Sequence, residues 1–335
     1  MTPRRRIVPV FVPHLGCPND CVFCDQRTIS GSLRPVRPAD VRRTLEEAQA
    51  ACGDAELAFY GGSFTAIPEA EQRSLLEAAQ PFLASGCLRS IRVSTRPDAI
   101  TPDKLALLKE YGVQTVELGA QSMDDRVLRL CGRGHTAAAT ADAAALVREA
   151  GLDLILQMMT GLPGADRESD LSTGERLTAL KPDGVRIYPT VILRGTALER
   201  LWREGKYKSH TVREAVELCA PIVDGFLRAG IPVLRLGLNP TEALSGGEAV
   251  GGAYHPALGE LVYGKLYLEK ARAAIRALPR LPRRLTLLVS ENRISRMTGL
   301  RGSNLLILRW EFGLEEVKVR GGAFPAETVA IIAEA

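Results

Sequence analysis

The feature that most constrains the fold is a regular alternation of short β-rich runs with longer amphipathic stretches over the first 240 residues. Short apolar runs predict buried strands, and longer runs of helical periodicity predict helices. The predicted strands are Ile7–Val12, Glu56–Tyr60, Ser90–Ser94, Thr115–Leu118, Asp153–Met158, Gly184–Tyr188 and Val233–Leu236. The predicted helices are Pro38–Ala51, Pro68–Leu83, Thr101–Tyr111, Thr136–Ala150, Arg167–Leu180 and Val212–Ala229. Repeated β-α units of this kind place the strands parallel to one another.

Six or seven such units predict an α/β fold, a full or partial parallel (β/α) barrel. In that fold, the loops at the C-terminal ends of the strands carry the chemistry. A doubly wound open sheet is the alternative.

The composition becomes glycine-rich after the last β-α unit, because residues 239–256 contain Gly246, Gly247, Gly251 and Gly252. We therefore expect a barrel domain over 1–238, a glycine-rich linker over 239–256 and a small α+β domain over 257–335. The last part should contain one helix and three strands, at Ala257–Leu278, Leu285–Val289, Asn304–Phe312 and Glu316–Arg320.

The cellular compartment is suggested by the seven cysteines and the lack of long apolar runs. An odd number of cysteines, three of them within eight residues, suits reduced thiols better than a disulfide framework. No run approaches the roughly 20 apolar residues of a membrane span, and Pro9 and Pro13 interrupt the short apolar run near the N-terminus. We expect a cytoplasmic protein without signal peptide or membrane segment.

Three of the cysteines, Cys17, Cys21 and Cys24, follow the first predicted strand with spacing C-x3-C-x2-C. Thiolates select zinc, copper(I) or iron-sulfur clusters. A four-iron cluster normally takes four cysteines, so three would leave one iron open to a non-protein ligand. The alternative is a zinc site with His14 as fourth ligand. The isolated Cys52, Cys87, Cys131 and Cys219 are expected to be inert thiols.

This cysteine spacing, with Phe23 before the last cysteine, resembles the signature of the radical S-adenosylmethionine (SAM) superfamily. The resemblance implies a 4Fe-4S cluster on Cys17, Cys21 and Cys24 that reductively cleaves SAM to a 5′-deoxyadenosyl radical. It also implies an electron donor such as ferredoxin or flavodoxin. Phe23 would lie near the adenine of SAM, or would otherwise only pack the loop.

Two glycines, Gly61 and Gly62, end the second strand and precede Ser63. A glycine pair allows close backbone approach to a ligand. The segment resembles the loop of the superfamily that binds the amino group of SAM. Taken alone, it would indicate only a tight turn.

Later segments resemble one subgroup, the radical SAM core of the Elongator catalytic subunit, and more distantly oxygen-independent coproporphyrinogen oxidase. They run from Ser94 to Asp98, from Glu117 to Thr136, from Gln157 to Gly164 and from Lys181 to Thr196. By this resemblance Ser94, Gln121 and Arg133 contact SAM, and a guanidinium suits its carboxylate. A surface salt bridge is the alternative for Arg133. His135 is equally suited to catalysis and to packing.

Tyr188 and Arg194 are the candidate substrate-contacting, catalytic residues, the alternative being that they close the barrel mouth. Two positions depart from the related sequences, which often have Glu at Ser94 and, in the oxidase group, Asp at Gln157. Acetyl-CoA chemistry is not expected, because no acetyltransferase domain follows the core.

The function expected from this resemblance is radical modification of an RNA base, in tRNA. The alternatives are a radical SAM enzyme acting on a small molecule, peptide or porphyrin-like ring, and a non-catalytic carrier of cluster and SAM. Charge distribution favours RNA, since Leu261–Arg320 contains 13 Lys or Arg and 5 Glu in a chain of net charge +4. Arg280, Arg283, Arg284, Arg293, Arg296 and Arg301, with Trp310 as a stacking surface, would then face tRNA. A solvated basic face without a partner is the alternative.

Overall fold

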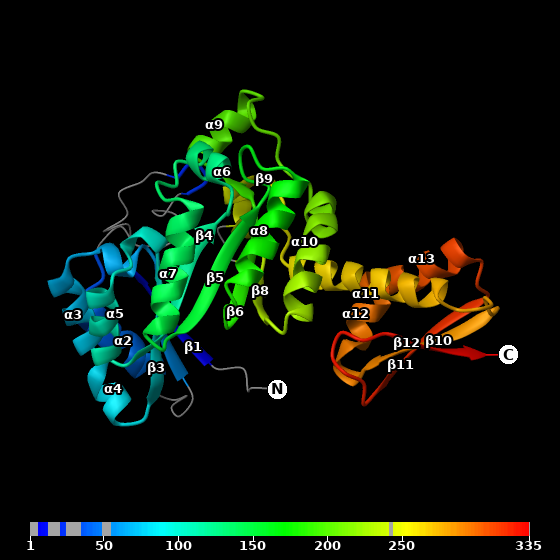
Figure 1. The fold of residues 1–335 in the computed structure, drawn as a ribbon, viewed down its shortest axis with the longest axis horizontal. Helices are drawn as coiled ribbons and strands as arrows, with labels where there is room; N and C mark the ends of the chain where they lie inside the picture. The colour runs from blue at the N-terminus through cyan, green and yellow to red at the C-terminus, as the bar shows by residue number, and fades with distance from the viewer. Residues whose placement is uncertain (1–5, 13–20, 25–34, 49–54, 241–243, 335) are drawn as a thin grey trace.

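The computed structural model describes residues 6–12, 21–24, 35–48, 55–240 and 244–334. Its centre is a parallel sheet of seven strands, in the order β1-β2-β3-β4-β5-β6-β8 (Figure 1). The strands are β1 (Arg6–Val12), β2 (Ala55–Gly61), β3 (Leu88–Thr95), β4 (Val113–Gln121), β5 (Asp153–Thr160), β6 (Gly184–Pro189) and β8 (Val233–Leu236). All seven strands expected for the barrel are present.

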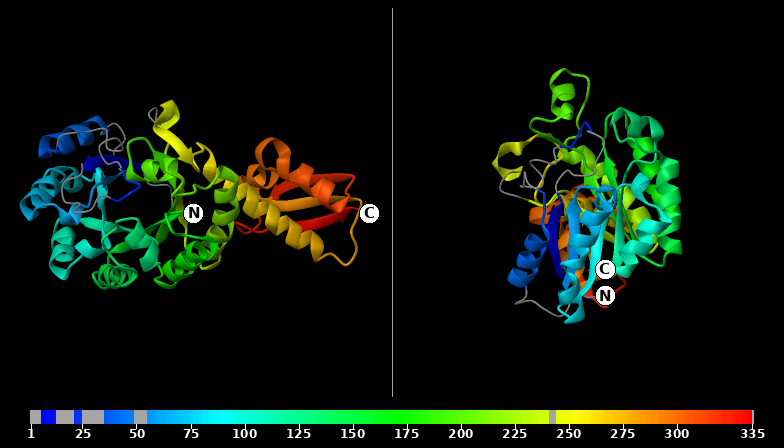
Figure 2. Two further views of the ribbon diagram at one scale, coloured as in Figure 1. Left: turned by 90° about the horizontal axis from the view of Figure 1, so that it is seen from above. Right: turned by 90° about the vertical axis from the view of Figure 1, so that its left-hand side faces the viewer.

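The strand order decides between the two expected folds. A doubly wound sheet reverses its order after the first pair of units, whereas here each strand lies beside the next one along the chain. The doubly wound alternative is therefore wrong. The sheet is a partial barrel, with β1 and β8 at its two edges and the helices arranged around it (Figure 2).

Helices cover the outer face of this sheet. They are α2 (Pro38–Ala48), α3 (Glu69–Glu77), α4 (Gln80–Ala84), α5 (Pro102–Glu110), α7 (Ala137–Glu149), α8 (Arg167–Ala179) and α10 (Val212–Arg228). The short helix α6 (Asp125–Leu130) lies instead at the C-terminal ends of the strands (Figure 1). The single helix expected at Pro68–Leu83 is instead two, α3 and α4, and Pro81 lies in the first turn of the second. Proline has no amide hydrogen for an earlier carbonyl, so it favours a new helix start.

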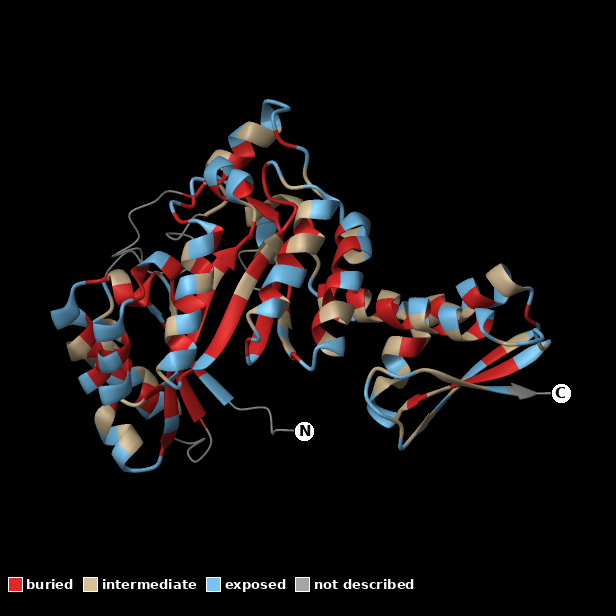
Figure 3. Cartoon of the chain, in the orientation of Figure 1, coloured by how far each residue is buried: buried red, intermediate tan, exposed pale blue. Residues whose placement is uncertain are grey.

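The two faces of the sheet differ in chemistry. On β1, Val8, Val10 and Val12 are buried against the helices, while Ile7 and Phe11 on the inner face are 38% and 42% exposed. On the other strands the inner positions are mostly polar, as detailed below. Figure 3 shows the buried stripe along the strands beneath the helices. The apolar core therefore lies between sheet and helices, which leaves the inner face for chemistry.

A pair of short strands and a short helix stand at the C-terminal ends of the strands. β7 (Val191–Leu193) pairs antiparallel with β9 (Ala249–Gly252), and α9 (Ala197–Arg203) follows β7. The glycine-rich segment thus returns to the barrel after the turn at Leu244–Glu248. The division expected at 239–256 stays a prediction.

The C-terminal part contains a three-stranded sheet with helices on one face. Its elements are α11 (Leu258–Arg276), β10 (Arg284–Ser290), α12 (Ile294–Thr298), α13 (Ser303–Phe312), β11 (Glu316–Gly322) and β12 (Ala330–Glu334). β10 is central, parallel to β11 and antiparallel to β12. Val262 near the start of α11 belongs to the barrel core and Ala271 near its end to the second core, so this helix joins both parts.

The strand expected at Asn304–Phe312 is wrong, since this segment is helix α13. Its apolar residues include types that are common in β-strands. In the helix, however, Asn304 and Leu308 are buried at the i, i+4 spacing of one helix face. Gly302 and Gly313 at its two ends adopt left-handed conformations. The strand β12 was not expected from the sequence.

Candidate functional site

The described part of the cysteine segment, Cys21–Cys24, lies beside loops that follow the parallel strands. Cys21 and Cys24 lie on one turn, closed by the Cys24 amide donating to the Cys21 carbonyl at 2.9 Å. Cys17 and the alternative ligand His14 lie outside the described residues. Groups of three metal-binding side chains are absent among the described residues, which include two of the three expected cysteines.

Backbone hydrogen bonds from two other loops hold this turn. The Val22 amide donates to the Cys131 carbonyl at 3.0 Å, and the Leu198 amide donates to the Val22 carbonyl at 2.7 Å. Phe23 is half-buried against two small apolar clusters, beside Leu162 in one and Tyr207 in the other. The turn is therefore fastened to the loops after β4, β5 and β7.

At the end of β2, the glycine pair makes a close backbone approach. Gly61 has a φ of +98°, and a Cβ there would lie 2.9 Å from the Val12 carbonyl oxygen. The Gly62 amide donates to that oxygen at 2.8 Å, and Ser63 is buried. The pair thus ties β2 to the end of β1, directly before the cysteine segment.

Arg133 connects the cysteine turn to β4. Its Nη2 donates to the Gly119 carbonyl at 2.8 Å, and its Nη1 lies 3.7 Å from Cys21 Sγ. Gln121, which ends β4 with a φ of +65°, exchanges two amide hydrogen bonds with Gln157 on β5, at 3.1 and 2.7 Å. Two of the predicted SAM residues, Gln121 and Arg133, therefore gather around Gly119.

The absence of a side chain at Gly119 makes this arrangement possible. A Cβ at Gly119 would lie 2.9 Å from both Arg133 Nη2 and Gln121 Nε2. Because φ at this glycine is not in the left-handed region, space rather than backbone conformation requires glycine here. Sequence reasoning did not single it out.

His135 is 7% exposed and its Nε2 lies 3.3 Å from the Ala120 carbonyl. Burial, reinforced by the nearby Arg133 guanidinium, lowers the pKa of His135 to about 4. The ring is therefore neutral near pH 7, which suits packing beneath the loop better than proton transfer.

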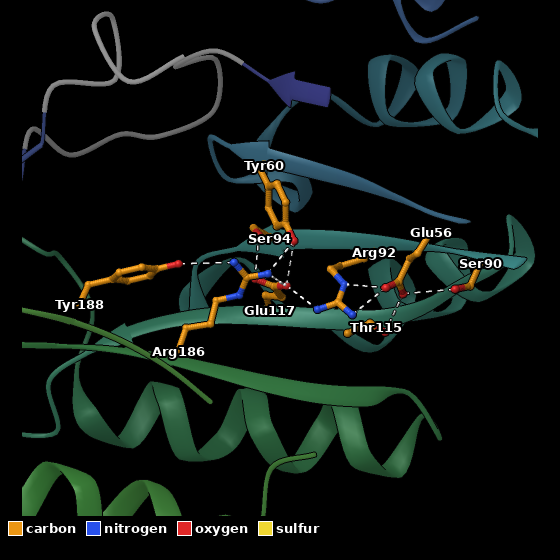
Figure 4. Close-up of polar contacts among 9 residues, drawn as sticks. All are labelled: Glu56, Tyr60, Ser90, Arg92, Ser94, Thr115, Glu117, Arg186 and Tyr188. Carbon is orange, nitrogen blue, oxygen red and sulfur yellow. Dashed lines mark hydrogen bonds and ion pairs between the residues drawn. The ribbon is translucent and has the colours of Figure 1, made fainter. Parts of the chain in front are cut away.

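A buried network of charged side chains lies on the inner face of the sheet (Figure 4). Glu117 on β4 accepts from Arg92 Nη1 at 2.6 Å and from Arg186 Nη2 at 2.9 Å. Arg92 also donates to Glu56 on β2, at 2.7 Å from Nη2, and Glu56 is fully buried. Two guanidinium groups and two carboxylates therefore alternate along the inner face.

The upper end of the network reaches tyrosines. Tyr60 accepts from Arg186 Nη2 at 2.6 Å, and the Arg186 guanidinium lies over its ring, 5.1 Å from the centroid. Arg186 Nη1 also donates to Tyr188 Oη at 3.4 Å. Ser94 Oγ donates weakly to Glu117 at 3.5 Å. Burial and the Glu117 carboxylate raise the pKa of Tyr60, so its phenol stays protonated.

Four residues of this network were not predicted from the sequence, namely Glu56, Arg92, Glu117 and Arg186. A signal was present, because polar residues recur at every second position of otherwise apolar strands, as in Ser90-Ile91-Arg92-Val93-Ser94. Tyr188, a predicted residue, does join this network. Arg194 does not, since it is exposed and its Nη2 donates to the Gly247 carbonyl at 3.1 Å.

The donor chemistry of the cysteine turn fits an iron-sulfur cluster. Two cysteines, Cys21 and Cys24, lie on one turn, and the Arg133 guanidinium donates toward the sulfur of Cys21; such hydrogen bonds tune clusters. Among the other cysteines, Cys131 and Cys219 are buried free thiols, as expected. Cys87 is disulfide-bonded, so the expectation of a free thiol there is wrong.

The C-terminal arginines are less available than their sequence suggested. Arg283 and Arg284 both pair with Glu315, at 3.3 Å. Arg293 and Arg296 both pair with Glu327, at 3.1 and 3.8 Å. Trp310, in contrast, is 87% exposed on α13.

Comparison with protein families gives two adjoining matches. A model described as the radical SAM superfamily matches residues 11–174, and one described as the Radical_SAM C-terminal domain matches residues 182–267. The first runs from the end of β1 through the cysteine turn and β5 into α8, and the second covers β6 to the first half of α11.

Curated relatives are similar over part of their length. The tRNA uridine(34) acetyltransferase of Dehalococcoides mccartyi (strain CBDB1) is 28% identical over 237 residues, covering 60% of this chain and 52% of that protein. Elongator complex protein 3 of Homo sapiens is 32% identical over 191 residues, covering 50% of this chain and 34% of that protein. The chain thus spans about half the length of the first and about a third of the second.

Solved structures share the fold. The archaeal Elp3 of Methanocaldococcus infernus, with an N-terminal deletion, has a TM-score of 0.63 at 24% identity, covering 80% of this chain and 63% of that one. Coproporphyrinogen III oxidase from Escherichia coli has a TM-score of 0.51 at 19% identity, covering 68% and 54%.

Proposed function

The chain belongs to the radical SAM superfamily, and from this premise we propose that it is a radical SAM enzyme that modifies a base of tRNA. The observation that carries the tRNA assignment is the similarity to a relative whose name specifies a tRNA uridine, together with Elongator complex protein 3. Membership of the superfamily implies a 4Fe-4S cluster, SAM and a reductant.

Cys17, Cys21 and Cys24 are the proposed cluster ligands. Cluster and SAM, when bound, supply reductive cleavage of SAM and hydrogen abstraction from the substrate. Within the chain, the turn at Cys21–Cys24 is held by Cys131 and Leu198 through backbone hydrogen bonds, which fixes the direction of both thiols. Such rigid support positions reactive groups.

Arg133 and Gln121 are the proposed ligands of SAM on the β4 side. Arg133 is held in one orientation by the Gly119 carbonyl, and an oriented guanidinium suits a carboxylate. Gly61, Gly62 and Ser63 would offer backbone groups to the amino group of SAM on the β2 side. Ser94, partly exposed on the inner face, would contact the ribose, and Phe23 would contact the adenine.

Tyr188 is the proposed substrate-contacting residue, because it is partly exposed on the inner face and is hydrogen-bonded by Arg186. Arg194 is kept as a second proposed contact, at the rim rather than on the inner face. Electrons would come from a small reductant such as ferredoxin or flavodoxin.

The test has two stages. Protein reconstituted anaerobically with iron and sulfide, then supplied with SAM and dithionite, should form 5′-deoxyadenosine. Cys24→Ser is the matched control and should form none. Undermodified bulk tRNA should then raise the yield and give, after nuclease digestion, a nucleoside of altered mass.

Two outcomes would contradict the proposal. Wild-type protein that forms no 5′-deoxyadenosine would contradict the enzymatic role. If SAM cleavage is not stimulated by tRNA, and no modified nucleoside is found in the tRNA, tRNA is excluded as the substrate. A small molecule or peptide would then be favoured.

A further inference from the structure

Two arginines lie side by side on the last two strands of the barrel. Arg186 of β6 is in register with Arg235 of β8, and residues in register on parallel strands project to the same face of a sheet. Figure 4 shows Arg186 directed into the inner face, toward Tyr60 and Tyr188. Arg235 therefore belongs to this face as well, at the edge of the sheet.

The carboxylates of the inner face are already engaged elsewhere. Glu56 is bonded by Arg92, and Glu117 is shared between Arg92 and Arg186. The three inner-face arginines on β3, β6 and β8 thus share these two carboxylates, and the register of β4 with β5 places a third carboxylate, Asp153, on the same face at the N-terminal end of β5. Arg235 donates from Nε and Nη2 to the carbonyls of Gly237 and Leu238, each at 2.9 Å. Carbonyl oxygens orient the guanidinium but leave its charge uncompensated.

The pair is accessible, whereas the carboxylates are not. Arg186 and Arg235 are both partly exposed, while Glu56 is fully buried and Glu117 is 5% exposed. Like charges on neighbouring strand positions repel one another, and an anion between them would remove that cost. Arg235 Nη1 has no hydrogen-bond partner among the described residues and remains able to donate.

We propose that Arg186 and Arg235 form a binding site for a phosphate group of the substrate. The inference rests on the proposed function, in which the substrate is an RNA and phosphates flank the target base. Guanidinium forks suit phosphate oxygens, and phosphate contacts fix the register of a nucleic acid. Arg133 beside Cys21 serves a different anion, the carboxylate of SAM.

Placement at β8 supports a large substrate. β8 is an edge strand of the open barrel, so a polymer reaching Arg235 passes the rim of the sheet rather than a closed wall. Tyr188 lies beside Arg186 at the C-terminal end of β6 and would meet the base attached to the bound phosphate. Glu117 is then a positioning residue, because it holds Arg186 from the buried side.

The experiment measures binding to the reconstituted protein by calorimetry, with uridine 5′-monophosphate, uridine, inorganic phosphate and bulk tRNA as probes. Arg235→Gln should weaken uridine 5′-monophosphate and phosphate about tenfold or more, as expected for loss of a charge-assisted hydrogen bond. Uridine should bind both proteins equally. Arg129→Gln, at an exposed position on α6, is the matched control and should bind all probes like wild type.

Arg235→Lys distinguishes a loss of phosphate binding from a loss of folding, because lysine keeps the positive charge but lacks the forked guanidinium group. It should bind phosphate between wild type and Arg235→Gln, and its thermal midpoint should match that of the wild type. Phosphate and uridine 5′-monophosphate binding unchanged in Arg235→Gln would overturn the site. Phosphate binding that depends on Arg235, without any added affinity for uridine 5′-monophosphate or tRNA, would keep the anion site and refute the RNA substrate.

Discussion

Arg133 Nη1 lies 3.7 Å from the sulfur of Cys21, although 112 residues separate the two in the chain. The same guanidinium donates to the Gly119 carbonyl of β4. Arg133 thereby ties the cysteine turn to the inner face, where Gln121 and Gln157 also meet. The candidate cluster site and the candidate SAM site are thus parts of one arrangement.

Substitution of the described cysteines tests the cluster ligands. Cys21→Ala and Cys24→Ala should each lose the brown colour and visible absorption of an iron-sulfur protein, because a cluster with three cysteine ligands has no spare one. Iron and sulfide content after anaerobic reconstitution provides the measurement. Cys219→Ala, at a buried free thiol on α10, should retain wild-type iron. Normal iron in Cys21→Ala or Cys24→Ala would refute the assignment.

Gly119→Ala should weaken SAM binding without unfolding the protein. The added Cβ would meet Arg133 Nη2 and Gln121 Nε2 at 2.9 Å, so both side chains must move. We expect an affinity loss of about tenfold, corresponding to one charge-assisted hydrogen bond, measured by equilibrium dialysis with SAM. Gly225→Ala is the control, because an added Cβ on this α10 glycine meets nothing within 4 Å. Unchanged SAM affinity in Gly119→Ala would show that a Cβ at this position does not disturb SAM binding through Arg133 and Gln121.

Glu117→Gln should destabilise the fold, since it leaves Arg92 and Arg186 sharing one carboxylate fewer. Breaking a buried ion pair from one side typically costs about 3–5 kcal/mol, measured as the free energy of unfolding in urea. Glu315→Gln is the contrasting variant, as its partner Arg283 is 86% exposed. Surface pairs contribute about 0–1 kcal/mol. Equal effects of the two changes would show that the inner network does not stabilise the barrel.

Asp170 predicts a pH dependence of stability. Burial raises its pKa to about 7, although the Gly161 amide donates to it at 2.8 Å. An unfolded Asp titrates near pH 4, so between about pH 4 and pH 7 the folded state holds the extra proton, and stability falls as pH rises. The full effect is about 4 kcal/mol.

Asp170→Asn keeps an acceptor for Gly161 and removes the titration. Its stability relative to wild type should therefore increase from pH 4 to pH 7 and then level off, measured by urea unfolding at each pH. In Asp166 the Ser169 amide holds the pKa below its usual value, so Asp166→Asn should change in the opposite sense only below about pH 4 and should track the wild type between pH 4 and pH 7. A wild-type profile in Asp170→Asn would contradict the assignment.

Binding of tRNA should depend on C-terminal arginines that lack acidic partners. Arg301 and Arg309 are exposed and show no ion pair among the described residues, whereas Arg283 pairs with Glu315. Arg301→Gln with Arg309→Gln should weaken tRNA binding and flatten its salt dependence, because fewer counterions are released. Arg283→Gln should have a smaller effect. Binding indifferent to salt and to both changes would leave this basic face without a nucleic-acid role.

The amino-acid sequence by itself determined the parallel strands, most of the helices and the cysteine motif. These features are local, since a strand period, a helix cap and a three-cysteine spacing are each contained within about 20 residues. The error at Asn304–Phe312 arose because β-rich residue types can also occupy a helix when one face is buried, as Leu308 is here. Tertiary packing overrides local propensity at such positions.

Only the tertiary structure decided which side chains meet on the inner face. Glu117 of β4 joins Arg92 on the neighbouring strand β3 and Arg186 on β6, two strands across the sheet, 25 and 69 residues away along the chain. Register between strands sets these distances, and register follows from how the whole barrel packs. Gly119 is a second example. A side chain is excluded at this position because Arg133, which the loop after α6 places beside it, would lie too close.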